Sequence, residues 1–261
     1  MAAGTYYYLA IVQTGPENLM KRAAELHENR DYIQAILLYD ELRGQEEFSA
    51  PDKQARLAFL TGGAYEQLWR SEQGGDEAFE QAIRAYDQTV EMDQSEMRIY
   101  AVDALLAKAE LLINRSQKSE QPDPQLEEQS WACLARLIQE PEFRLNPAVH
   151  RGVPHRMLAE RTEEEDPQTA IQLLREARDA QRELEEGVEN LQIAQIYLNI
   201  LNQPEQAEEY FELVKQNELA NEEIRKSAER ALEELRGDEI GAPPLYGDEI
   251  LEILPELEDD L

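Results

Sequence analysis

The residue types that most often carry out chemistry are scarce in this 261-residue chain, and their spacing does not bring them together. The three histidines are His27, His150 and His155. His150 and His155 flank a glycine and a proline, whereas helical zinc ligands usually lie three or four residues apart, and no cysteine pair accompanies them. Cys133 is the single cysteine and lies on an apolar helix face, where we expect a buried, inert thiol. The pattern therefore predicts no metal site.

Carboxylates are numerous, but nothing in their spacing indicates a catalytic pair. The run Glu163 to Asp166 is typical of a solvated turn ahead of a helix, and paired acid catalysis needs two carboxylates at a fixed separation in a cleft. Glycine pairs at 62–63 and 74–75 lie in a helical pattern and in a turn, so neither indicates a phosphate-binding loop. No serine occupies a nucleophile elbow. We predict that the chain is not an enzyme and binds no cofactor.

The charge balance limits the classes of partner. The net charge is −31, from 56 acidic and 25 basic residues, which opposes binding to nucleic-acid backbones or anionic membranes. Two interpretations of this acidity stay open, a solvated, salt-tolerant surface or an affinity for basic partners. A single cysteine favours a reducing compartment, and no segment approaches the ~20 apolar residues of a membrane span. We expect a cytoplasmic protein that makes no direct contact with nucleic acid.

Three stretches repeat one helical pattern, in which an alanine precedes an aromatic residue by four positions. The pairs are Ala35 and Tyr39, Ala82 and Tyr86, and Ala207 and Phe211. This spacing places both side chains on one helix face. The small residue lets a neighbouring helix approach closely, and the ring fills the space beside it. Repeated helix pairs of this kind build solenoids, which usually bind other molecules.

The rest of the chain also predicts an all-α fold, because apolar residues recur at three- and four-residue spacings and no stretch alternates like a strand. Prolines and capping residues mark the helix starts, including Asp31, Ser95, Asp123 and Asn221. About eleven helices result, mostly in antiparallel pairs. The pairs cover roughly 16–47, 51–93, 95–140, 147–186 and 188–217, and a helix at 221–236 closes the array. Two prolines and a glycine at 140–156 predict a break that could divide the array into two lobes.

The two ends of the chain differ from the array. Residues 1–15 contain the apolar run Tyr6 to Val12, which we interpret as a cap over the first repeat, with a partner-binding surface as the alternative. Residues 237–261 are acidic, contain no basic residue and yet carry apolar side chains. Three interpretations of this tail stay open: a flexible segment, a docking peptide for a basic or apolar groove, or a segment that folds back. Docking would use Leu245, Tyr246, Ile250, Leu251, Leu254 and Leu257.

Together these patterns resemble the tetratricopeptide repeat (TPR) family, whose helix-turn-helix unit carries small and large residues at set positions. The matching positions are Ala23, Leu26, Ala35 and Tyr39 in the first pair, Gly62, Tyr65, Ala82 and Tyr86 in the second, and Leu191, Gln195, Leu198, Ala207 and Phe211 in the fifth. The third pair fits least, since Leu134 and Leu137 replace the aromatic and small residues. The resemblance implies a right-handed superhelical array over 16–236.

The resemblance further implies that the first helix of each pair lines a concave groove. Matched position by position, the groove residues are Met20, Ala24, His27, Arg56, Phe59, Gly63, Glu66, Gln192, Ile196 and Asn199. Each of them also has an ordinary interpretation, as packing between repeats or as solvated surface. Arg56 is the only firm cation among them, which disfavours recognition of acidic peptide tails.

We therefore hypothesise a non-catalytic adaptor, scaffold or assembly factor that binds a peptide of another protein in this groove. The alternative is an acidic, chaperone-like shield for a basic client protein, supported by the net charge and the tail. A third and weaker possibility is a regulatory subunit whose tail docks on a partner.

Overall fold

The computed structural model describes residues 15–118, 122–150, 152–180 and 187–237, and these residues form helices and connecting turns without a strand. The all-α prediction is confirmed, with twelve α-helices in the described ranges against the expected eleven. Contacts divide the chain into two compact units, one that ends at Val149 and one that begins at His150, and each is described by itself. The superhelical order and the membership of the TPR family stay predictions.

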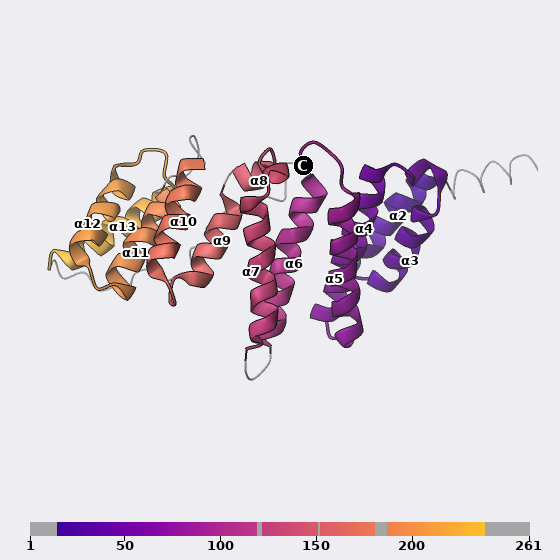
Figure 1. The fold of residues 1–261 in the computed structure, drawn as a ribbon, viewed down its shortest axis with the longest axis horizontal. Helices are drawn as coiled ribbons and strands as arrows, with labels where there is room; N and C mark the ends of the chain where they lie inside the picture. The colour runs from indigo at the N-terminus through magenta and orange to yellow at the C-terminus, as the bar shows by residue number, and fades with distance from the viewer. Residues whose placement is uncertain (1–14, 119–121, 151, 181–186, 238–261) are drawn as a thin grey trace, which may run out of the picture. The chain divides into compact units, whose positions relative to one another are not determined.

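The first unit contains the longest helices (Figure 1). In chain order its elements are α2 (Pro16–Glu28), α3 (Tyr32–Arg43), the 3-10 turn η1 (Glu46–Phe48), α4 (Pro51–Arg70), α5 (Gly75–Met92), α6 (Ile99–Gln117), α7 (Pro124–Gln139), the 3-10 turn η2 (Pro141–Phe143) and α8 (Pro147–His150). Each helix from α2 to α6 packs against the next one, α4 also contacts α6, and α7 contacts η2. The second unit contains α9 (Val153–Thr162), α10 (Pro167–Ala180), α11 (Gly187–Gln195), the π-helical turn η3 (Ile196–Ile200), α12 (Pro204–Gln216) and α13 (Glu222–Leu235).

Several helices begin where the sequence predicts. The Asp31 carboxylate accepts a hydrogen bond from the backbone N–H of Gln34 at 3.4 Å, and Asp123 and Asn221 each accept one at 2.9 Å in the same way. These side chains pair donors that the first turn of a helix leaves without an intrahelical partner. Helices α2, α4, α7 and α12 begin with proline, whose missing N–H is not needed there.

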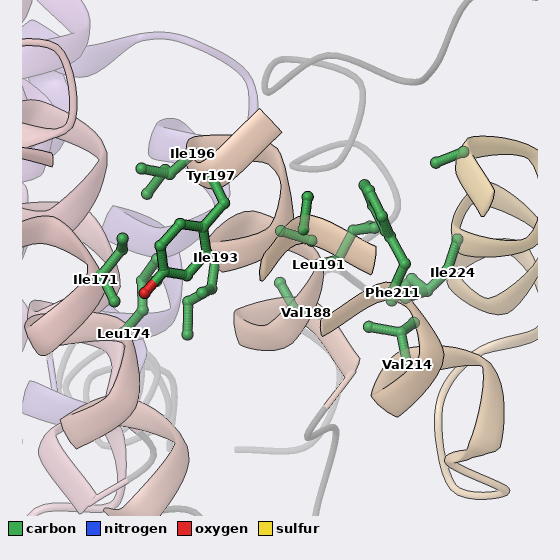
Figure 2. Packing of buried hydrophobic residues seen from close by; sticks show 14 of the residues in the cluster. Ile171, Leu174, Val188, Leu191, Ile193, Ile196, Tyr197, Phe211, Val214 and Ile224 are labelled. Atoms are coloured by element: carbon green, nitrogen blue, oxygen red, sulfur yellow. The ribbon is translucent and has the colours of Figure 1, made fainter. Parts of the chain in front are cut away.

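The alanine–aromatic pairs lie in the cores of the two units. Ala82 and Tyr86 are 0% and 2% exposed, and a Cβ on Gly62 of α4 would come within 2.7 Å of the Tyr86 ring. The ring of α5 therefore occupies the space that the missing side chain of α4 leaves. In the second unit, Phe211 belongs to a cluster of buried residues contributed by α9 to α13 (Figure 2).

The proline-rich region at 140–156 contains short elements rather than one long helix. Helix α7 ends before Glu140, the turn η2 and the four-residue helix α8 follow, and α9 begins at Val153. Gly152 has a φ of +71°, a conformation that glycine adopts readily, and a Cβ there would lie 2.7 Å from the Ala177 backbone. Proline rings and this left-handed residue explain why no continuous helix crosses the region.

Candidate functional site

Helices α2, α4 and α6 of the first unit present side chains on adjoining faces. The His27 Cε1 atom of α2 lies 4.0 Å from the point where Gly63 of α4 would carry a Cβ. The Phe59 ring of α4 lies 6.2 Å from the Tyr100 ring of α6 and 6.0 Å from the Tyr86 ring, centroid to centroid. These distances place side chains of the three helices near one another. We call this surface the first-helix face; it consists of Met20, Ala24, His27, Arg56, Phe59, Gly63 and Tyr100.

The predicted residues on this face differ in exposure. Ala24 and Arg56 are exposed, and Met20, His27, Phe59 and Gly63 are partly exposed. Met20 also packs against the core cluster beneath α2 and α3. The face thus combines small residues that leave room with an aromatic ring and a guanidinium group, which are enriched among the side chains that dominate protein–protein binding.

His27 is more an apolar than an ionic member of the face. Its ring meets the Tyr32 ring edge-on at 5.2 Å, and its Nδ1 atom is buried without a hydrogen-bond partner in the described part of the chain. Burial lowers the pKa of His27 below 6.5, against a smaller opposite effect of the Glu28 carboxylate. The imidazole is therefore neutral at neutral pH.

Glu66 does not belong to the exposed face, which corrects the sequence-based assignment. The residue is 8% exposed, the Arg70 Nε donates to its carboxylate at 2.8 Å, and the Tyr86 hydroxyl donates to it at 2.5 Å. Burial, followed by the charge and hydrogen bond of Glu66, raises the pKa of Tyr86. Glu66 lies four residues after Gly62, on the side of α4 that faces α5, so its role is to link these two helices.

Of the three groove residues predicted in the second unit, two are at least partly exposed and one is buried. Asn199 is exposed and Gln192 is partly exposed, but Ile196 is only 2% exposed and lies in the core (Figure 2). Ile196 begins the π-helical turn η3 and belongs to the buried cluster that includes Ile171 and Leu174. The groove assignment from the TPR-like spacing is therefore wrong for Ile196, and the alternative interpretation, packing between helices, describes this residue.

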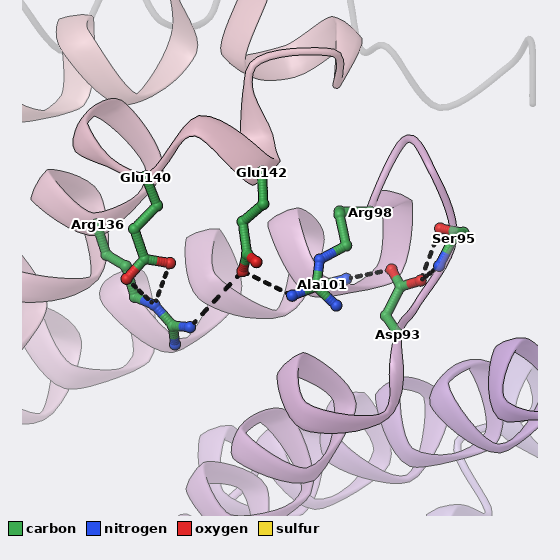
Figure 3. A network of polar contacts seen from close by, with 7 residues as sticks. All are labelled: Asp93, Ser95, Arg98, Ala101, Arg136, Glu140 and Glu142. Atoms are coloured by element: carbon green, nitrogen blue, oxygen red, sulfur yellow. Dashed lines mark hydrogen bonds and ion pairs between the residues drawn. The ribbon is translucent and has the colours of Figure 1, made fainter.

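Sequence reasoning missed the polar network that holds the start of α6 (Figure 3). Asp93 is fully buried; its Oδ1 accepts hydrogen bonds from the N–H and hydroxyl of Ser95, and its Oδ2 accepts one from the Ala101 N–H at 2.9 Å. Ser95 was expected to begin the helix, but α6 begins at Ile99, after Arg98 in the left-handed conformation with φ +49°. Asp93 thus caps α6 from eight residues upstream, which no local capping pattern indicates.

A second group of side chains fastens the turn η2 to α6 and α7. Glu142 binds the Arg98 guanidinium at 2.6 Å, and the guanidinium groups of Arg98 and Arg136 both lie 5.7 Å from the centroid of the Phe143 ring. Phe143 is fully buried. The Asn146 amide then donates to the Met97 carbonyl at 3.0 Å. This arrangement brings the residues after η2 next to the start of α6.

Apolar side chains emerge at this junction. The exposed fractions of Met97, Ile99 and Leu145 are 40%, 37% and 62%. The neighbouring Tyr100 lies next to the Phe59 ring of the first-helix face. We call the set Phe59, Met97, Ile99, Tyr100 and Leu145 the Ile99 patch. Sequence reasoning did not single out residues 97–100 as an exposed surface.

One carboxylate lies beside the Ile99 patch. Asp103 follows Ile99 by four residues and Tyr100 by three, so all three share a side of α6. Burial, together with the Asp93 carboxylate, raises the pKa of Asp103 from 3.8 to about 6. No ion pair of the described residues involves Asp103.

The remaining predictions concern the two chain ends, the cysteine, metal sites and membrane spans. The tail residues Leu245, Tyr246, Ile250, Leu251, Leu254 and Leu257 and the run Tyr6 to Val12 lie outside the described residues. Cys133 is buried as expected, and burial raises the pKa of its thiol. Within the described ranges, histidine, cysteine and acidic side chains form no group of three suited to a metal ion. None of the helices there has the length and apolarity needed to cross a membrane.

Comparison of the chain with family models, with curated protein sequences and with solved structures found no match.

Proposed function

We propose that this chain is a non-catalytic, cytoplasmic protein-interaction module that binds a segment of another protein on its first-helix face. The observation that carries the proposal is that His27 lies near Gly63 and the Phe59 ring lies near the Tyr100 ring, which places partly exposed rings beside small residues. Apolar and aromatic surface that a protein's own helices leave uncovered is typical of binding sites. The TPR-like residue pattern supports the same role.

The face has the chemical character that an extended or helical peptide requires. Ala24 and Gly63 leave room for the backbone or side chains of a bound segment, and Phe59 offers an apolar surface next to them. Arg56 is exposed at the same side of α4 and can donate hydrogen bonds to peptide carbonyl groups. Recognition would therefore combine apolar contact with a few directed hydrogen bonds.

The test is affinity capture with the tagged full chain from native cells, using an obstruction on the face and a matched one away from it. Ala24→Arg places a long side chain on α2, and Gln34→Arg adds the same charge at an exposed position of α3. We expect Ala24→Arg to remove specific partners that wild type and Gln34→Arg both retain. If both variants capture the same proteins as wild type, the face is not the binding surface.

The net charge of −31 favours a second candidate, an acidic shield for a basic client protein. Salt separates the two functions, since the Debye length falls from ~8 Å at physiological ionic strength to ~3 Å at 1 M. A complex that dissociates in about 1 M salt and is insensitive to Ala24→Arg supports the shield. A complex that persists in about 1 M salt and is lost with Ala24→Arg supports the interaction module.

A further inference from the structure

The Ile99 patch gathers most of the large apolar side chains that the first unit exposes in its described part. The exposed large apolar residues there are Ile33, Leu37, Met97, Ile99 and Leu145. The last three lie at the junction of α6 with the residues after η2, although Met97 and Leu145 are far apart in the chain. Exposed apolar side chains that lie at one junction are typical of interaction sites, whereas apolar residues scattered singly need no explanation.

The backbone under the patch is held in place, so the exposure does not come from a loose helix end. The buried Asp93 carboxylate pairs the N–H of Ala101, and Arg98 is fixed by Glu142 and by the Phe143 ring. On the other side, the Asn146 amide holds the Met97 carbonyl. A surface that is already ordered loses little conformational entropy when a partner binds, which favours affinity.

Beside Met97 and Ile99 the charges that take part in no ion pair of the described residues are negative, whereas Arg144, next to Leu145 at the edge of the patch, is an exposed cation. Asp103 and the exposed Glu96 take part in no ion pair of the described residues, whereas Arg98 is engaged by Glu142. Asp103 is already partly withdrawn from water. An uncharged or acidic partner would bury this carboxylate without compensation, but a cation would pair with it in a setting of low dielectric constant.

We infer that the Ile99 patch binds a protein segment in which a lysine or arginine lies next to apolar residues. The cation pairs with Asp103, and the apolar side chains cover Met97, Ile99 and Leu145. The inference rests on the proposed function, because it names the kind of partner that the first-helix face and its continuation onto α6 would recognise. The overall acidity of the chain adds long-range attraction for such a segment.

The experiment uses a phage-displayed library of random 12-residue peptides, selected on the full chain and counter-selected on the double variant Ile99→Ser, Asp103→Asn. We expect enriched peptides to carry lysine or arginine beside apolar residues. Each enriched peptide is then synthesised with a fluorescent label, and its dissociation constant is measured by anisotropy against the full chain and its single variants. Circular dichroism of every variant confirms that it is folded.

Matched controls separate the patch from general attraction to an acidic protein. Ile33→Ser removes an exposed isoleucine from α3, and Glu41→Gln removes one exposed carboxylate from the same helix. We expect Ile99→Ser and Asp103→Asn each to weaken peptide binding by about tenfold or more, in line with close charge pairs at interfaces. Ile33→Ser and Glu41→Gln should change it by less than about twofold.

Five results would overturn the inference. Four of them are an absence of enriched peptides, enrichment of peptides without a basic residue, equal weakening by the α3 controls, and a dimer of the full chain that Ile99→Ser dissociates. The dimer would assign the patch to a second copy. Peptides that ignore the patch variants but lose binding with Ala24→Arg would overturn the partner assignment and leave the proposed function standing.

Discussion

Asp103→Asn should stabilise the protein at neutral pH. The structure keeps this carboxylate partly buried without a counter-ion, and its pKa rises from 3.8 to about 6. At ~1.36 kcal/mol per pKa unit this corresponds to about 3 kcal/mol, and solvent screening of a partly exposed group lowers the expected gain to about 1–2 kcal/mol. An asparagine of the same shape removes the charge and therefore the penalty.

The stability gained by Asp103→Asn should increase as the pH rises from 4 to 6. Because the pKa is higher in the folded state, the folded protein binds the proton more tightly than the unfolded chain between pH 4 and 6. The wild-type free energy of unfolding therefore loses this contribution as pH rises through that window. We expect the advantage of Asp103→Asn to be full at pH 7.5 and about half as large at pH 5.0.

Urea unfolding followed by tryptophan fluorescence measures the free energy of unfolding of the first unit, which contains Asp103. Both tryptophans, Trp69 and Trp131, lie in the first unit with Asp103. At pH 5.0 the chain is still above its isoelectric point of about 4.4 and keeps a negative charge. The reasoning is refuted if Asp103→Asn lowers the free energy of unfolding at pH 7.5, or if its effect is the same at both pH values.

Asp93→Asn is the matched control, with the opposite expected sign. Both oxygens of Asp93 accept hydrogen bonds from groups at the start of α6. An asparagine would direct an NH₂ group at a donor that is now paired, most directly the Ala101 N–H. We expect a loss of about 1–3 kcal/mol, the range for leaving a buried polar group without a partner.

Two further pairs of substitutions test the packing. Gly62→Ala should destabilise by about 1–3 kcal/mol in the same urea assay, because its Cβ would overlap the Tyr86 ring, whereas Gly63→Ala has room and should be neutral or stabilising by up to about 1 kcal/mol. Ile196→Ala should lower the thermal midpoint measured by circular dichroism, with a loss of about 2–5 kcal/mol for a core residue. Asn199→Ala is exposed and should stay within about 0.5 kcal/mol; a neutral Ile196→Ala would contradict its place in the core.

Local signals account for what the sequence predicts correctly. The caps at Asp31 and Asn221 act within three residues of themselves, so a short stretch of sequence is enough to find them. The Ala82–Tyr86 spacing likewise depends only on helix geometry. The all-helical fold can therefore be predicted from the sequence alone.

Interactions between distant residues account for what the sequence does not predict. The sequence predicts that the helix begins at Ser95, whereas α6 begins at Ile99, because the Asp93 side chain caps the helix in place of a local residue. Glu66 is buried because Tyr86, twenty residues away, donates to it. The Ile99 patch depends on a hydrogen bond from Asn146 to a residue 49 positions earlier. Such pairings have no signal in the periodicity of a single sequence.

Site-specific photo-crosslinking in native cells tests the central claim most directly. A photoreactive amino acid is placed at Ala24 on the first-helix face, and at Gln34 on α3 as the control, since both positions are exposed. If the face binds a protein segment, illumination should yield a discrete crosslinked product from position 24 and none of the same mass from position 34. No product from position 24, or identical products from both, would contradict the claim.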